Sequence, residues 1–416
     1  MRVRPWLLWL LVAAPLVADS SGEAWKALDA AASRGDLEAA LEATGEMSAT
    51  DLAAFLRDGR AYPEPEAGQT RVDLVDGAGT KSWGMIEVPS TFRPGNGVIL
   101  LLHGLGDVPD SLMRMYRSYS QKEGLILAAP CAKPLAKEVE EADEPKLKII
   151  KPEVWWSYKS HGFPLELLAE VKRRYDIDED RVVLSGYSMG GFGAWNIGMR
   201  FPDRFAGVVA YAGGVSRNEW FVKEDKLARE LLVNFLHTPI FFLHGDADFT
   251  VPIKGDRLSK KCLEDLGYDF VYREVKRSQH MLPVGDGSKL HGEITSWIDE
   301  RRRDAAPAQV VHVAHDLDHA AAYWVRIDAM EGGTALVDAE WSDEGLRVDS
   351  EGVTKLTVFV RGDASASVRV TWNGKARDVE CETGKPVLLE SWLLHEDRRM
   401  VWEAKLSLSS GDDSGR

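Results

Sequence analysis

The chain has 416 residues, of which 44% are hydrophobic, and it carries a formal net charge of −15. This length exceeds one typical domain and the hydrophobic content is ample for a packed core, so we expect two domains with appendages. The acidic balance, with no stripe of Lys and Arg interleaved with aromatic residues, argues against nucleic acid and against docking on anionic lipid. The composition therefore indicates a globular protein with no nucleic-acid partner.

Residues 1–20 have the pattern of a secretory signal peptide. A basic start at 1–4 is followed by an apolar run at 5–17 and then by small or polar residues at 18–22. The apolar run is shorter than the roughly 20 residues of a membrane span, although an uncleaved N-terminal anchor is the alternative. We predict cleavage near Ala18, a periplasmic or extracellular location, and no integral membrane span after cleavage.

Cysteine usage indicates no disulfide framework and no zinc site. Only three cysteines occur, at wide spacing: Cys131, Cys262 and Cys381. Two of them could pair in an exported protein, but an odd and scattered set favours small, mostly buried hydrophobic side chains. We predict no metal and no organic cofactor.

Residues 22–62 are predicted to form a helical N-terminal segment. Alanine and leucine recur at helical spacing, and Thr50 or Asp51 is a candidate N-cap. We expect two or three helices that pack against the main domain. A Pro-rich stretch at 62–68 reads as a linker.

Strand and helix patterns alternate between residues 68 and 304. An antiparallel hairpin is predicted at 70–75 and 83–88, then strands at 98–102, 125–129, 182–184, 205–211, 240–243 and 270–275, with helices at 109–123, 164–175, 254–266 and 290–303. Strands separated by helices imply a mostly parallel sheet covered on both faces. We therefore expect a doubly wound α/β domain.

Two segments interrupt this alternation, at 133–151 and 218–236. The first is rich in Lys, Glu and Pro, and the second carries Trp220, Phe221 and Phe235. Such insertions can shape a substrate pocket above the sheet, and solvated loops are the alternative. The run Trp155-Trp156-Ser157-Tyr158 favours pocket lining, although core positions suit these aromatic residues equally well.

Residues 308–408 read as an all-β sandwich, followed by a polar tail at 409–416. Short strands are predicted at 309–315, 321–328, 335–340, 345–349, 355–360, 367–372, 376–380, 387–390 and 401–408. Five tryptophans fall in this part: Trp324, Trp341, Trp372, Trp392 and Trp402. Exposed, they would suit sugar stacking, but we expect them to fill the core.

One stretch, Gly186-Tyr187-Ser188-Met189-Gly190, has the G-x-S-x-G pattern between a predicted strand and a helix-like segment. A serine on such a sharp turn has a strained backbone, and a side chain at Gly186 or Gly190 would collide with the neighbouring strand and helix. The pattern alone is loose, and a chance match is the alternative. Its placement predicts that Ser188 is a nucleophile.

A nucleophilic serine needs a histidine and a carboxylate, which on such a fold follow it in the order acid, then histidine. Asp246 and Asp248 both follow the strand 240–243. We favour Asp248 as the acid, because a carboxylate there can reach across the strand ends. Asp246 is expected to hold the loop through its own backbone.

The predicted base is His280, on the loop after the strand 270–275, where an imidazole can reach Ser188. His291 comes later, in or beside the last predicted helix, and is expected at the surface.

Two backbone amides are predicted to stabilise negative charge on a substrate oxygen. The first amides of the helix after Ser188 lack partners, so the Met189 N–H can donate. The two glycines that flank Leu105 let that loop fold toward Ser188, which would place the Leu105 amide opposite. His103 is expected to be a structural hydrogen-bonding residue.

Four motifs, taken together, resemble the α/β-hydrolase superfamily: His103-Gly-Leu-Gly-Asp107, Gly186-Tyr-Ser-Met-Gly-Gly191, His244-Gly-Asp-Ala-Asp-Phe-Thr-Val-Pro252 and His280. Its phospholipase/carboxylesterase or prolyl oligopeptidase-like esterase branch is the nearest, over roughly residues 68–304. The resemblance implies a nucleophile at Ser188, an acid at Asp248, a base at His280 and oxyanion donors at Leu105 and Met189.

We expect an exported serine hydrolase that cleaves small-molecule or polysaccharide-linked carboxylic esters through an acyl-enzyme. A serine peptidase of prolyl oligopeptidase type and an acyltransferase would use the same residues. The alternative from another class is a catalytically silent carbohydrate- or surface-binding protein on the same scaffold.

Overall fold

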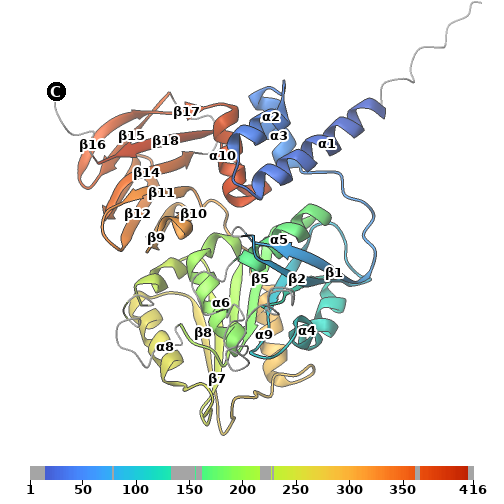
Figure 1. The fold of residues 1–416 in the computed structure, drawn as a ribbon. Helices are drawn as coiled ribbons and strands as arrows, with labels where there is room; N and C mark the ends of the chain where they lie inside the picture. The colour runs from blue at the N-terminus through green and yellow to red at the C-terminus, as the bar shows by residue number, and fades with distance from the viewer. Residues whose placement is uncertain are drawn as a thin grey trace, which may run out of the picture.

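The computed structural model describes residues 15–76, 79–132, 155, 162–215, 226, 229–360 and 366–410, with side chains from residue 22 onward. Most of the predicted signal peptide, the insertion 133–151, residues 156–158, Trp220 and Phe221 lie outside the described residues. The same holds for the tail beyond residue 410. Figure 1 shows an α/β layer structure below, two small β-sheets above it on one side, and the N-terminal helices on the other side.

The central sheet has eight strands in the order β1-β2-β4-β3-β5-β6-β7-β8. Their bounds are β1 (Gly68–Val75), β2 (Lys81–Val88), β3 (Asn96–Leu102), β4 (Ile126–Pro130), β5 (Ile177–Tyr187), β6 (Gly207–Tyr211), β7 (Ile240–Gly245) and β8 (Phe270–Val275). The pairs β1–β2 and β2–β4 are antiparallel, and all later pairs are parallel. The inner strands are continuous apolar runs, as expected for parallel strands buried on both faces.

Helices cover both faces of this sheet, which confirms the doubly wound α/β prediction. One face packs α5 (Gly162–Arg174), α6 (Met189–Arg200) and α8 (Lys254–Leu266), and the other packs α4 (Pro109–Glu123) and α9 (Lys289–Asp299). Alternate residues of β3 divide between the two cores, because side chains point to opposite faces along a strand.

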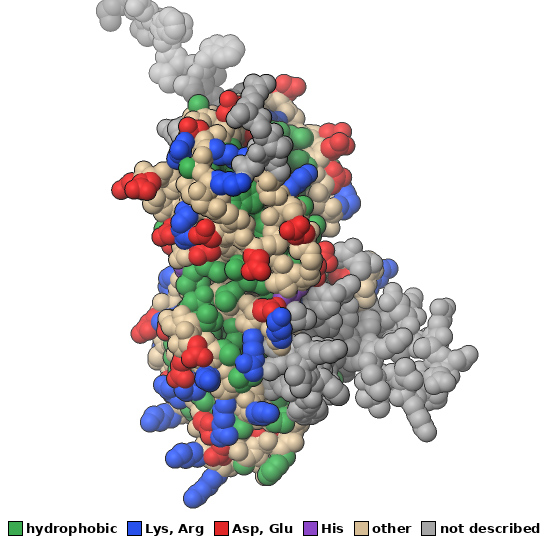
Figure 2. Space-filling model, turned by 90° about the vertical axis from the view of Figure 1, so that its left-hand side faces the viewer, with side chains coloured by type: hydrophobic (Ala, Val, Ile, Leu, Met, Phe, Trp, Pro, Cys, Tyr) green, Lys and Arg blue, Asp and Glu red, His purple; other side chains and the backbone are tan. Residues whose placement is uncertain are grey.

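The outer surface of α8 is solvated and charged. Arg257 pairs with Glu274 of β8, and Lys260 pairs with Glu264 along the helix. On the face of the molecule drawn in Figure 2, basic and acidic side chains are interspersed. Within the described ranges, no helix combines the length and the apolar character needed to cross a bilayer.

The N-terminal helices are α1 (Pro15–Ala32), α2 (Leu37–Thr44) and α3 (Ala49–Asp58). The N-cap of α3 is Ser48, whose Oγ accepts from the Asp51 N–H at 3.1 Å, so the cap lies two residues before Thr50. Their apolar faces share one cluster with the C-terminal helix α10 (Lys385–His395), where Trp25 stacks on Phe55 with ring centroids 4.6 Å apart. The apolar faces thus pack on α10, and α1 contacts the α/β domain through an ion pair of 3.7 Å between Asp29 and Arg173 of α5.

The C-terminal part consists of two five-stranded sheets, β10-β11-β14-β18-β17 and β16-β15-β13-β12-β9. Their strands are β9 (Gln309–Ala314), β10 (Ala321–Ala322), β11 (Val325–Met330), β12 (Ala335–Ser342), β13 (Gly345–Glu351), β14 (Val353–Val360), β15 (Ser367–Trp372), β16 (Lys375–Glu380), β17 (Glu382–Thr383) and β18 (Ala404–Ser409). Side chains from both sheets meet in one core. Of the five tryptophans, only Trp341 is half-buried and the others are buried, so the core prediction is confirmed.

The strand predicted at 387–390 was wrong, because these residues belong to helix α10. Pro386 lies in the first turn of that helix, where its fixed backbone angle favours a helix start. A short apolar run does not by itself separate a strand from a buried helix. None of the three cysteines forms a disulfide, and only Cys131 is buried.

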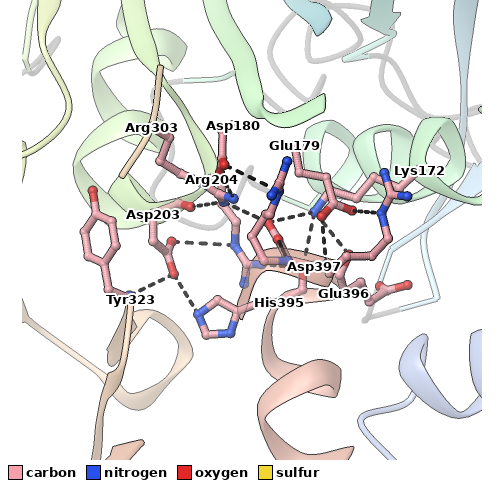
Figure 3. A network of polar contacts seen from close by, with 12 residues as sticks. Lys172, Glu179, Asp180, Asp203, Arg204, Arg303, Tyr323, His395, Glu396 and Asp397 are labelled. Carbon is pink, nitrogen blue, oxygen red and sulfur yellow. Dashed lines mark hydrogen bonds and ion pairs between the residues drawn. The ribbon is translucent and has the colours of Figure 1, made fainter. Parts of the chain in front are cut away.

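A buried ionic network joins the central sheet to the C-terminal part (Figure 3). Arg303 follows α9, and its guanidinium lies 2.8 Å from Asp397 and 2.7 Å from Asp180. The side chains of Arg303 and Asp397 are 1% and 0% exposed. Burial alone would raise the pKa of Asp397, but Arg303 and Lys172 hold it well below its usual value.

The second half of the network is built on Asp203, in the 3-10 turn η2 (Pro202–Arg204). Its Oδ2 accepts from the Tyr323 N–H at 3.1 Å and lies 2.9 Å from Nε2 of His395. Arg204 donates to the His395 carbonyl at 2.6 Å, at the C-terminal end of α10. Cations there satisfy carbonyls that the helix leaves unpaired.

We predict that Arg303→Met lowers the free energy of unfolding by about 3–5 kcal/mol, because it removes the cation closest to the buried carboxylate of Asp397. Thermal and urea unfolding would measure the change. The matched control is Arg302→Met, since Arg302 is exposed and donates to the nearby carbonyls of Asp299 and Arg301. Equal stability of the two variants would contradict this account.

Candidate active site

Ser188 lies on the turn between β5 and α6 with φ 56° and ψ −115°. This backbone conformation is strained for any residue with a side chain. A Cβ atom on Gly186 would lie 1.9 Å from the Gly190 carbonyl oxygen, and one on Gly190 would lie 1.8 Å from the carbonyl oxygen of Leu102. Only glycine fits both positions, and the close packing holds the turn at the end of the strand.

The structure brings Ser188, His280 and Asp248 into one hydrogen-bonded row. The Ser188 Oγ lies 2.8 Å from Nε2 of His280, and Nδ1 of the same ring lies 2.7 Å from Oδ2 of Asp248. A carboxylate only accepts, so Nδ1 carries the proton. Nε2 is then free to accept the proton of the serine hydroxyl.

Asp248 is fixed as an ionised acceptor. Its Oδ1 accepts from the backbone N–H groups of Thr250 at 2.8 Å and Val251 at 2.9 Å. Burial alone would raise the pKa of Asp248, but these amides and His280 lower it below its usual value. The carboxylate therefore orients His280 without taking its proton.

The competing carboxylate, Asp246, is exposed and has another contact. Its Oδ1 accepts from the Arg277 N–H at 2.5 Å, on the loop that carries His280. The expectation that Asp246 holds its own loop was wrong, because it ties two neighbouring loops together.

His291 is buried, contrary to the expected surface position. It lies in the first turn of α9, in line with Ile294 and Ile298 at helical spacing, so it faces the core. Its ring centroid is 5.8 Å from that of Tyr116 in α4.

The loop that carries Leu105 approaches Ser188 closely. A Cβ atom on Gly104 would lie 3.8 Å from the Cβ of Ser188. His103 is buried and fixes this loop: its Nε2 accepts from the Ala132 N–H at 3.1 Å, so its Nδ1 donates to the Gly104 carbonyl at 2.8 Å. His103 thus forms structural hydrogen bonds, as expected.

Met189 is the first residue of α6, and the Phe192 amide bonds back to the Ser188 carbonyl at 3.0 Å. Amides in the first turn of a helix have no partner within the helix. The roles of the Leu105 and Met189 amides as oxyanion donors stay predictions.

The two described aromatic residues of the expected pocket lining are core residues. Trp155 is fully buried and donates to the His103 carbonyl at 3.1 Å. Phe235 is buried edge-on against Trp195, with ring centroids 5.7 Å apart.

Sequence reasoning missed Tyr187, the variable residue before the serine. Its hydroxyl donates to the His280 carbonyl at 2.7 Å and accepts from the Leu282 N–H at 2.6 Å. Burial raises the pKa of Tyr187 to about 12, so it stays protonated. Its ring stacks on Tyr211 with centroids 5.5 Å apart. The motif leaves this position free, so only the side-chain type, a tyrosine at a strand end, could have indicated the contact.

Comparison with known proteins finds similarity in the part of the chain that carries this site. A family model described as Phospholipase/Carboxylesterase matches residues 164–292, which include Ser188, Asp248 and His280. This match confirms the resemblance that the motifs indicated. Acyl-protein thioesterase 1 of Gibberella zeae is 28% identical over 104 residues, 24% of this chain and 41% of that protein. S-formylglutathione hydrolase of Paracoccus denitrificans is 37% identical over 71 residues, 17% of this chain and 24% of that protein.

The chain therefore spans less than half the length of these relatives. Among solved structures, an S-formylglutathione hydrolase from Agrobacterium tumefaciens has a TM-score of 0.44 and 18% identity, over 58% of this chain and 95% of that one. The Pyrococcus horikoshii acylaminoacyl peptidase has a TM-score of 0.44 and 13% identity, over 57% of this chain and 42% of that one.

We predict that Tyr187→Phe slows the labelling of Ser188 by a fluorophosphonate probe about tenfold. The change removes two hydrogen bonds that hold the His280 loop, and tenfold in rate corresponds to a loss of about 1.4 kcal/mol, within the roughly 0.5–1.5 kcal/mol that each bond contributes. The control is Tyr268→Phe, because the Tyr268 hydroxyl donates to the Val233 carbonyl and not to the loop that carries His280. Labelling of the Tyr187 variant at the wild-type rate would refute the positioning role.

Proposed function

We propose that this protein is a serine hydrolase that cleaves carboxylic esters or thioesters through an acyl-enzyme on Ser188. The observation that carries the proposal is the row of hydrogen bonds from Ser188 through His280 to Asp248, at 2.8 and 2.7 Å. The family match over the same residues supports it. Action in the periplasm or outside the cell belongs to the proposal on the strength of the N-terminal pattern.

In the proposed mechanism, the Ser188 Oγ attacks the substrate carbonyl while its proton passes to Nε2 of His280. The imidazolium is stabilised by the ionised Asp248 and then protonates the leaving alcohol or thiol. Water enters, gives a proton to His280 and attacks the acyl-enzyme, which releases the acid and restores the serine. The Met189 and Leu105 amides are the proposed donors to the oxyanion.

The names of the similar proteins favour esters and thioesters over amides, since they are an acyl-protein thioesterase and an S-formylglutathione hydrolase. A peptidase or an acyltransferase would use the same residues and remains the alternative within the enzyme class. The silent binding protein is disfavoured, because a site without catalysis has no use for a strained serine within 2.8 Å of an imidazole.

Three apolar residues on the loops that carry the proposed site have exposed side chains. Leu105 is 56% exposed, Phe249 follows Asp248 and is 89% exposed, and Met281 follows His280 and is 78% exposed. Exposed apolar side chains that gather at one place commonly mark a ligand-binding surface. We therefore include an apolar acyl group in the proposed substrate.

We predict that Ser188→Ala abolishes fluorophosphonate labelling and lowers p-nitrophenyl ester turnover by at least about a thousandfold. Labelling followed by mass spectrometry and initial rates measure the two effects. Unchanged labelling and turnover in this variant would end the proposal, and faster cleavage of peptide amides than of esters would replace it with the peptidase.

The two aspartates offer a matched pair for the same assay. Asp248→Asn should lower kcat about 10⁴-fold, because an amide favours the wrong histidine tautomer. Asp246→Asn, two residues away and exposed, should stay within about tenfold of wild type. The reverse order would show that the acid is assigned to the wrong residue.

We predict that kcat/KM for p-nitrophenyl esters rises with each methylene from acetate to hexanoate, by up to about fourfold per step at ~0.8 kcal/mol per buried methylene. In the double variant Phe249→Ser/Met281→Ser this rise should be flatter, while acetate turnover stays near wild type. A chain-length series with both proteins tests this. Parallel slopes would exclude these two side chains from acyl binding.

A further inference from the structure

A second histidine and aspartate pair lies directly behind the carboxylate of Asp248. His244 is near the end of β7 and its side chain is 0% exposed. Its Nδ1 lies 2.7 Å from Oδ2 of Asp256, a buried residue in the first turn of α8. Its Nε2 lies 2.9 Å from the Val251 carbonyl oxygen and 3.2 Å from Oδ2 of Asp248.

With Asp256 ionised, the contacts of His244 take two donated protons. Both ring nitrogens face acceptors only, two carboxylates and a carbonyl, and a neutral imidazole has a single N–H. Burial alone would lower the pKa of His244, but the hydrogen bond and charge of Asp256 raise it above the usual value. Burial also raises the pKa of Asp256, whose Oδ1 has no hydrogen-bond partner in the described part of the chain. His244 is its counterion.

The charge on His244 acts on one particular oxygen. Oδ2 of Asp248 takes the Nδ1–H of His280 at 2.7 Å and also faces the Nε2–H of His244 at 3.2 Å. A second cation beside this oxygen reduces its negative potential and weakens its hold on the His280 proton. A positive charge on His244 therefore disfavours a second positive charge on the His280 ring, which shares the same carboxylate oxygen.

The other ionisable groups around His244 are already paired or remain neutral. Glu274 lies opposite His244 in the β7–β8 register, and Arg257 of α8 holds it in an ion pair. Tyr272, also on β8, has its pKa raised by burial and by Asp256, so it stays protonated. Asp256 and Asp248 are therefore the charges that face the ring.

We propose that His244 is a positioning residue of the same site: its buried imidazolium, held by Asp256, shares the Asp248 carboxylate with His280 and extends the working range of the catalytic base toward acid pH. This inference rests on the proposed function, since it assigns His280 as the base. It adds to that function a positive charge on His244 of β7, held by the Asp256 carboxylate of α8, behind the row of three residues.

The test is the pH profile of kcat/KM for a p-nitrophenyl ester. We expect His244→Gln, which keeps a donor toward Asp248 but loses the charge, to move the acid limb upward by about one pH unit. Asp256→Asn removes the counterion and should move the limb the same way. The control His237→Gln, half-buried and bonded to the Gln309 carbonyl, should leave the limb in place.

If His244 had a merely structural role, its variants would lower the maximal kcat/KM and leave the acid limb of the pH profile in place. That result, or a shift of the acid limb to lower pH, would overturn the inference. A second readout needs no activity. The Ser188→Ala protein is labelled with ¹⁵N-histidine, and the His244 ring resonances are identified as the pair that disappears in the His244→Gln variant. At pH 7 this pair should show both ring nitrogens protonated. A neutral His244 ring at pH 7 would refute the proposed charge even if the protein has no esterase activity, whereas inactivity with a charged ring would refute only the proposed function.

Discussion

The strained turn at Ser188 is the constraint on which the site depends. Backbone carbonyls of α6 and β3 occupy the space that a Cβ atom on Gly186 or Gly190 would need. This packing forces the serine into a left-handed conformation at the end of β5 and directs its hydroxyl toward the loops beyond β7 and β8. A few residues with almost no side-chain volume thus decide where the hydroxyl lies.

Sheet order then explains how distant residues meet. Strands β5, β6, β7 and β8 are consecutive neighbours and parallel, so their carboxyl ends share one edge. The loops after β7 and β8 are joined by backbone contacts, including Ala247 N–H to the Ser278 carbonyl at 3.0 Å. Tyr187 adds a tie from the serine turn to the His280 loop. His280 and Asp248 are positioned by these contacts between loops as well as by their own hydrogen bond.

The parts outside the α/β domain are coupled to it through polar contacts. The cations Arg303, Lys172 and Arg204 reach acidic groups and carbonyls of the C-terminal part, and buried charges of this kind are tolerated only when each has its partner. The N-terminal helices in turn pack on α10. Such a junction fixes the mutual orientation of the parts, because a small displacement would leave charges buried and unpaired.

The sequence by itself determined the alternation of strands and helices, the serine turn, and the histidine and aspartate that meet it. The strands and helices follow from the periodicity of apolar residues, and the serine, the aspartate and the histidine can each be recognised from the residues directly around them in the chain. Only the tertiary structure decided that 387–390 is helical, that His291 is buried, and that Tyr187 and His244 contact the site. Each of these depends on which elements lie against one another, and such contacts join residues whose spacing along the chain carries no periodic signal.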